Sequence, residues 1–248
     1  VSGVLDLWRF GSIRWRSDEH AVYSPLVVKP TSIIAPEEIT SFGGTGSESF
    51  EVEFGYSGAY APQVHGLALP LIVNGFVDND PTKTFTFRET NGVTRHVISV
   101  PAGQLYARFS LFDLLTDGDD DLDLYVYYCG LDGSSCTRLG ESGEPTSEER
   151  FDIFRPSEGL YAVHVHGFET DEVQGGPGSN YQLLAWAFGE SDDRGNMSAN
   201  GPAFVSAGTT GTVTVDWQGL VSNTIYLGGI SHNTPQGLSD LTLVTIGN

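Results

Sequence analysis

Basic side chains are scarce in this sequence: 12 Lys and Arg stand against 32 Asp and Glu, which gives a formal net charge of −20. A surface with this charge repels nucleic acid phosphates and anionic lipid headgroups. The sequence therefore excludes nucleic acid and membranes as partners, and it suits a soluble life outside the cell. Long apolar runs are also missing, since none approaches the ~20 residues that a membrane-spanning helix needs.

Helical periodicity is almost absent as well. Apolar and polar residues instead alternate over short runs, and clusters of Gly, Pro, Asn and Asp separate these runs. This alternation is typical of antiparallel strands with one buried face and one wet face. The sequence therefore predicts an all-β fold made of antiparallel β-sandwich or jelly-roll domains. The expected strands include residues 49–54, 83–88, 122–128, 160–165 and 212–217.

Four β segments are expected along the chain. They are residues 1–30, 37–76, 77–189 and 192–248, with a Pro-containing linker at 31–36. The second and fourth segments are each small for an independent sandwich. One hypothesis is that these two form a single domain into which the third is inserted. Antiparallel pairing between residues 49–54 and 212–217 would support it.

Cysteine occurs only twice, as Cys129 and Cys136 in C-G-L-D-G-S-S-C. This spacing suits a small hairpin loop closed by a disulfide, whereas a two-thiol metal site would need further ligands nearby. A disulfide implies an oxidising compartment, so we expect a secreted, extracellular protein. Because the sequence has neither an initiator Met nor a signal peptide, Val1 is expected to begin a processed product or a fragment.

Carboxylates crowd the stretch D-G-D-D-D-L-D that begins at Asp117. Asp117, Asp119 and Asp121 alternate as the first three ligands of a calcium loop do, and Asp123 follows them. The Gly and Glu of an EF-hand are not at the required offsets, so other residues would complete the calcium shell. The alternative interpretation is structural: Asp121 or Asp123 caps a turn or accepts backbone N–H groups where a strand begins.

Two stretches together resemble a known family. The run D-L-D-L-Y-V-Y at 121–127 and the run G-L-Y-A-V-H-V-H-G at 159–167 are similar to the bacterial pre-peptidase C-terminal domain. That domain is a β-sandwich found behind the catalytic units of secreted proteases, and some of its members depend on calcium. The resemblance implies that residues 77–189 are an accessory part of an extracellular enzyme.

Residues 9–28 carry a second resemblance. They are similar to the closing strands of the fibronectin type III-like domain that follows the catalytic domain in cucumisin-type subtilisin-like proteases. The matching residues are Gly11, Ser12, Trp15, His20, Val22, Ser24 and Pro25. Together the two resemblances imply the C-terminal region of a secreted subtilase. They name the catalytic domain of the parent protease as a partner, and an insoluble protein substrate as a second one.

The motifs of subtilase catalysis are missing. The family's serine lies in G-T-S-M-A-x-P and its histidine in H-G-T-H, and neither string occurs. The two His-Gly pairs, at His65 and His166, are followed by Leu67 and Phe168 instead. No G-x-S-x-G elbow surrounds a suitable serine. The chain is therefore expected to hold no catalytic residue. The resemblance nevertheless implies that it is part of a serine endopeptidase, so whether the chain counts as an enzyme stays open.

Three functions are open from the sequence. The first is a non-catalytic accessory region that assists the folding, secretion, stability or substrate targeting of the protease. The second is a stand-alone module that binds insoluble protein or polysaccharide through Tyr125, Tyr127 and Tyr128. The third is an extracellular adhesive or structural β protein. An exposed row of at least two tyrosines would favour binding, and burial of all would favour a scaffold role.

Overall fold

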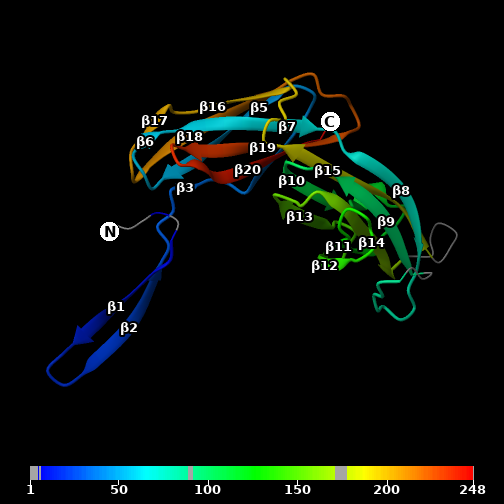
Figure 1. The fold of residues 1–248 in the computed structure, drawn as a ribbon, viewed down its shortest axis with the longest axis horizontal. Helices are drawn as coiled ribbons and strands as arrows, with labels where there is room; N and C mark the ends of the chain where they lie inside the picture. The colour runs from blue at the N-terminus through cyan, green and yellow to red at the C-terminus, as the bar shows by residue number, and fades with distance from the viewer. Residues whose placement is uncertain (1–4, 6, 89–91, 171–177, 248) are drawn as a thin grey trace. The chain divides into compact units, whose positions relative to one another are not determined.

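The computed structural model describes residues 5, 7–88, 92–170 and 178–247 (Figure 1). In this part of the chain the only helical element is η1 (Asp113–Leu115), a single 3₁₀ turn. The predicted all-β, antiparallel class is confirmed, although β4 (Glu38–Phe42) lies parallel to β20 (Gly237–Gly247). No described helix has both the length and the apolar character needed to cross a membrane.

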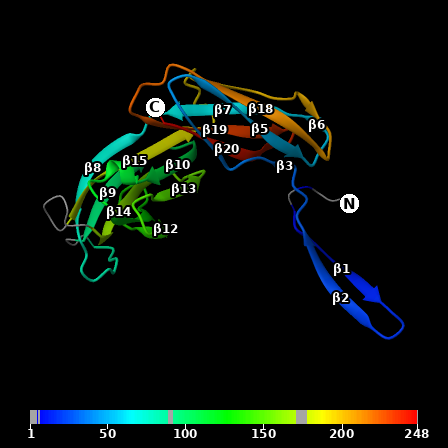
Figure 2. The same ribbon diagram turned by 180° about the vertical axis from the view of Figure 1, so that it is seen from behind.

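The chain divides into two compact units. Unit 1 comprises Val1–Leu67 and Asp193–Asn248, and unit 2 comprises Ala68–Asp192. The pairing named above as support for an insertion is present, because β5 (Gly46–Phe54) lies antiparallel to β18 (Thr209–Trp217). Two segments far apart in the sequence thus share one sheet of unit 1 (Figures 1 and 2).

The boundary between the units differs from the predicted one. Residues 71–76 were expected in the same segment as β5, but they belong to β8 (Leu71–Asp78). This strand pairs antiparallel with β15 (Gly178–Gly189), from Leu71 opposite Ala185 to Asp78 opposite Gly178. Hydrogen bonding along the whole strand therefore places it in unit 2.

Unit 1 contains two four-stranded sheets. Its further strands are β3 (Ile33–Ile34), β6 (Gly58–Ala59), β7 (Ala61–Ala68), β16 (Met197–Asn200), β17 (Phe204–Val205) and β19 (Ile225–Thr234). One sheet has the order β16-β18-β5-β3 and the other β4-β20-β19-β7, with β6 and β17 as a small separate pair. The predicted linker at 31–36 is wrong in part, because Ile33 is buried and pairs with Phe54 as part of β3.

Side-chain alternation builds the core of unit 1. Phe50, Val52 and Phe54 point inward from β5, whereas Glu51 and Glu53 between them are exposed. Both sheets contribute to the same buried cluster, so unit 1 is a sandwich. Other members of the cluster are Val213, Val215, Trp217, Tyr226, Ile230, Val244 and Ile246.

Unit 2 is a second sandwich of two four-stranded sheets. Its further strands are β9 (Val93–Val100), β10 (Gln104–Ser110), β11 (Asp121–Tyr128), β12 (Thr137–Ser142), β13 (Arg150–Phe154) and β14 (Gly159–Glu169). The sheet orders are β13-β10-β15-β8 and β12-β11-β14-β9. The core takes one face of each sheet, and includes Phe109, Leu122, Leu124, Val126, Tyr161, Val163, Val165 and Leu183.

A hairpin of β1 (Arg9–Arg16) and β2 (Ala21–Val28) forms a two-stranded sheet of its own. Every residue of the two strands except Ser24 is exposed. Trp15 lies opposite Val22 on one face, and Phe10 lies opposite Val27 on the other. An isolated two-stranded hairpin is marginally stable in water. We therefore expect these exposed apolar side chains to pack against further protein surface.

Candidate functional site

A buried cluster of ionisable side chains lies on the outer face of the β12-β11-β14-β9 sheet. Asp123 on β11 is directly opposite His166 on β14, and its Oδ2 is 3.1 Å from Nδ1 of the imidazole. The other ring nitrogen, Nε2, is 3.0 Å from Oδ2 of Asp80. Because His166 is only 1% exposed, its ring is enclosed between two carboxylates.

The protonation of this cluster follows from its geometry. Burial alone would lower the pKa of His166, but the hydrogen bonds and negative charges of Asp123 and Asp80 outweigh burial and raise it. Burial would likewise raise the pKa of Asp80, yet hydrogen bonds from His166, Thr82 and Thr84 lower it to about 2. In the imidazolium form, both ring N–H groups of His166 donate to carboxylates, so each ring nitrogen has a hydrogen-bond acceptor.

Asp80 also fixes the segment that covers this face, residues 79–88, which we call the strap. Its Oδ1 accepts hydrogen bonds from the backbone and hydroxyl of Thr82, and its Oδ2 accepts one from the backbone of Thr84. Phe85 of the strap stacks on Tyr125 with ring centroids 3.7 Å apart. The predicted strand at 83–88 is therefore wrong: its alternate phenylalanines pack on top of a sheet instead of extending one.

The three candidate binding tyrosines do not form an open row. Tyr125 lies under Phe85, and Tyr127 contacts Phe87 with centroids 4.7 Å apart. The hydroxyl of Tyr128 donates to the backbone oxygen of Glu158. All three are half-buried, so neither of the two exposure patterns expected from the sequence is found. A binding role for them stays a prediction.

The four aspartates of the proposed calcium loop turn to different partners. Asp117 accepts hydrogen bonds from Ser179 Oγ and from the backbone and amide nitrogens of Asn180. These bonds outweigh burial and lower its pKa. Asp123 faces His166, Asp119 is exposed, and Asp121 is half-buried. Burial and the negative charges of Asp123 and Glu169 raise the pKa of Asp121.

This arrangement does not fit a calcium ion, which needs six to eight converging oxygens. Within the described residues, no group of three or more His, Cys, Asp or Glu is placed to hold a metal. Calcium binding stays an untested prediction from the sequence. Because the four carboxylates face different partners, the structure leads us to expect no calcium site here. We expect the Tm of the chain to be the same in a chelator and in millimolar calcium. A Tm that rises with calcium, and does not rise in Asp119→Asn/Asp121→Asn, would contradict this expectation.

A second buried carboxyl lies near the cluster. Glu149 is 1% exposed, and its Oε1 accepts a hydrogen bond of 2.6 Å from the backbone of Glu144. The hydroxyl of Ser142 donates to its other oxygen. Burial raises the pKa of Glu149 to about 7, and the charges of Asp123 and Glu144 add to this, while the two hydrogen bonds oppose it.

The cluster can anchor the strap, but it offers no atom to an outside substrate. Both nitrogens of His166 already face carboxylates, and the ring is enclosed. The sequence placed Asp123 in the expected calcium loop and drew attention to His166 through its His-Gly pair, but the Asp–His–Asp contact was missed. The alternation in D-L-D and H-V-H carried the available signal, because it places these polar side chains on one face of adjacent strands.

The predicted disulfide is confirmed: Cys129 and Cys136 are bonded, and they close the loop between β11 and β12. Because the loop is short, the bond removes little entropy from the unfolded chain. We expect reduction to lower the free energy of unfolding by about 2 kcal/mol. Urea melts with and without a phosphine reductant measure this, with the Cys129→Ser/Cys136→Ser variant as a control that should not respond. Equal melts of the native chain in both conditions would contradict the prediction.

Comparisons with known proteins identify no family for this chain. No family model matches the chain, and no curated protein matches it. Among solved structures, PliG of Aeromonas hydrophila, a periplasmic inhibitor of g-type lysozyme, is similar over 48% of this chain and 87% of its own, with 13% identity and a TM-score of 0.31. A likeness this distant carries no argument about function.

Proposed function

We propose that this chain is a non-catalytic accessory region of a secreted subtilisin-like serine protease, which assists the folding, secretion, stability or targeting of the catalytic unit. The β1–β2 hairpin is the observation that carries the proposal. It includes the Gly-Ser-x-x-Trp stretch, and its exposed apolar faces fit a pair of strands that belongs to a larger fibronectin type III-like sandwich.

Two further features support the proposal. The disulfide is typical of proteins in oxidising compartments, so it favours an extracytoplasmic location, and secretion is the specific form that we propose. The enclosed Asp80–His166–Asp123 cluster suits a structural role better than a catalytic one. The tyrosine face, covered by the strap, does not favour the alternative of a stand-alone binding module.

A chimaera tests the proposal. In a cucumisin-type protease of the kind that the hairpin resembles, this chain replaces the closing strands of the fibronectin-like domain and everything after them. We expect secreted, active protease, because Trp15 and Val22 would pack into the host sandwich. The matched control, Trp15→Ser/Val22→Ser in the same chimaera, should lose secretion.

Three measurements separate the outcomes: secreted protein, caseinolytic activity and the Tm of the catalytic unit. Equal secretion of the chimaera and its control would reject the hairpin's role. The isolated chain, assayed alone on casein and gelatin, should hydrolyse neither. Hydrolysis that persists after the serine inhibitor phenylmethylsulfonyl fluoride would reject the non-catalytic assignment and point to another chemistry.

A further inference from the structure

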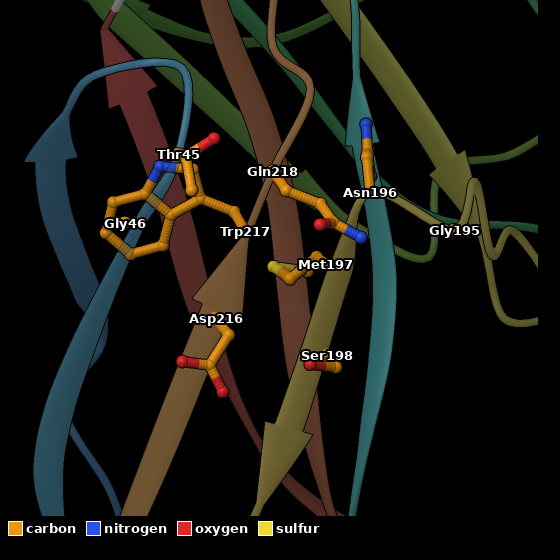
Figure 3. A pocket seen from close by; sticks show the side chains of 9 residues that line it. All are labelled: Thr45, Gly46, Gly195, Asn196, Met197, Ser198, Asp216, Trp217 and Gln218. Carbon is orange, nitrogen blue, oxygen red and sulfur yellow. The ribbon is translucent and has the colours of Figure 1, made fainter.

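A hollow of about 340 Å³ opens in unit 1 at one end of the sheet that contains β16, β18 and β5 (Figure 3). Its walls come from the turn before β5, from the start of β16 and from the end of β18. The volume falls at the lower end of the range for small-molecule sites. The proposed accessory function makes no use of this hollow.

The walls of the hollow are fixed by hydrogen bonds. The indole N–H of Trp217 donates to the backbone oxygen of Gly43 at 2.9 Å. Asn196 clamps the backbone of Leu67 through both ends of its amide, at 2.8 Å and 3.0 Å. The backbone N–H of Gln218 donates to the backbone oxygen of Asn196. A site held in this way needs little reordering to accept a ligand.

Gly46 keeps one side of the hollow open. A Cβ at this position would lie 2.3 Å from Cζ2 of Trp217, far inside a normal contact. Only glycine therefore lets the backbone of β5 lie flat against the buried indole. Trp217 and Met197 also line the hollow, and both are buried members of the core of unit 1.

Three exposed polar residues line the hollow: Ser198, Asp216 and Gln218 (Figure 3). Ser198 and Asp216 are cross-strand partners, so their side chains rise from the same face of the sheet. Within the described part of the chain, none of the three side chains has a hydrogen-bond or ionic partner. Their full bonding capacity is available to a ligand.

The chemistry of this lining selects one class of ligand. No Lys lines the hollow and its single charge is a carboxylate, so an anion is disfavoured, and one carboxylate is too few for a metal ion. The two carboxylate oxygens of Asp216 can each accept a hydrogen bond, while the side chains of Ser198 and Gln218 can both donate and accept. We infer that the hollow binds a neutral carbohydrate: a pair of adjacent hydroxyls donates to Asp216, and a further hydroxyl exchanges hydrogen bonds with Gln218 and Ser198.

This inference does not rest on the proposed accessory function, because it concerns unit 1 alone and needs no protease. The test is calorimetric titration of the full chain with cellohexaose, xylohexaose, laminarihexaose and chitohexaose. We expect at least one of them to bind with a dissociation constant in the micromolar to millimolar range. Asp216→Asn and Gln218→Ala should each weaken that binding about tenfold or more.

Glu51→Gln is the matched control, since Glu51 is exposed on β5 of the same sheet but lies outside the hollow. It should leave the affinity unchanged, and all variants should keep the Tm of the parent chain because the replaced side chains are exposed. Failure of all four oligosaccharides to bind at millimolar concentration would overturn the inference. So would binding that Asp216→Asn and Gln218→Ala leave intact.

Discussion

Replacing His166 with leucine is expected to lower the stability of unit 2 by about 3–5 kcal/mol, the range measured when one partner of a buried ion pair is removed. The imidazolium sits between Asp80 and Asp123, with both ring nitrogens about 3 Å from a carboxylate oxygen. Leucine fills much of the same space but leaves two carboxylates without their cation. Their mutual repulsion and their desolvation then oppose folding.

The strap should respond first. Asp80 joins the strap to the sheet through His166. Further strap contacts include aromatic stacking, the exposed Lys83–Glu169 pair and the backbone hydrogen bond from Asp80 N–H to the Gly167 oxygen. Hydrogen exchange read by mass spectrometry reports each unit separately. We expect faster exchange in the strap and across β11 and β14 in His166→Leu, with no change in unit 1.

Two variants make this test decisive. His20→Leu repeats the same chemical change at an exposed position of the hairpin, and it should leave exchange in unit 2 unaltered. The triple variant Asp80→Asn/Asp123→Asn/His166→Gln removes all three charges, and it should recover part of the loss. A loss below 1 kcal/mol in His166→Leu would mean that water reaches the carboxylates and that the cluster does not hold the strap.

The sequence predicted the strands well where alternation reflects burial. Residues 122–128 and 160–165 lie within β11 and β14, and their apolar residues on one face pack into the core of unit 2. Residues 83–88 show the same alternation and form no strand, because Phe85 and Phe87 pack on Tyr125 and Tyr127. A period of two says which side chains share a face. It does not say whether a neighbouring strand or a covering segment meets that face.

The candidate site shows the same limit. Asp123 and His166 each stood out in the sequence, but 43 residues separate them, and only the register of β11 against β14 brings them together. The calcium expectation relied on the local crowding of Asp117 to Asp123. Partners distant in the sequence, Asn180 and His166, take up two of those carboxylates.

The two units are expected to respond to pH in opposite directions, and unit 1 responds to acid. His232 is fully buried: its Nε2 is 2.8 Å from Thr242 Oγ1, and its Nδ1 is 2.6 Å from the Tyr60 hydroxyl. Because Thr242 donates its proton to the Pro36 oxygen, it must accept from Nε2–H. Burial lowers the pKa of His232 from 6.5 to about 4, so near pH 7 the ring is neutral and its Nδ1 accepts from the Tyr60 hydroxyl.

This stabilisation of unit 1 is present above pH 6.5 and is lost as the pH falls through about 4. Unit 2 has the opposite sign. The pKa of Glu149 is raised from 4.5 to about 7, so its contribution is present below pH 4.5 and is lost as the pH rises through about 7. The raised pKa of His166 acts in the same direction above its ordinary value of 6.5.

Hydrogen exchange at pH 4.5 and pH 8, corrected for the intrinsic exchange rate, should therefore show unit 2 losing on the order of 2 kcal/mol of stability at the higher pH while unit 1 gains. Glu149→Gln keeps the side-chain shape without the titrating proton, and it should flatten most of the response of unit 2. Glu158→Gln, an exposed change in the same unit, should leave it intact. Weakening of both units between these two pH values would contradict the prediction, because buried His232 and Glu149 could not then set their stability. Repulsion within the net charge of −20 would be the better explanation.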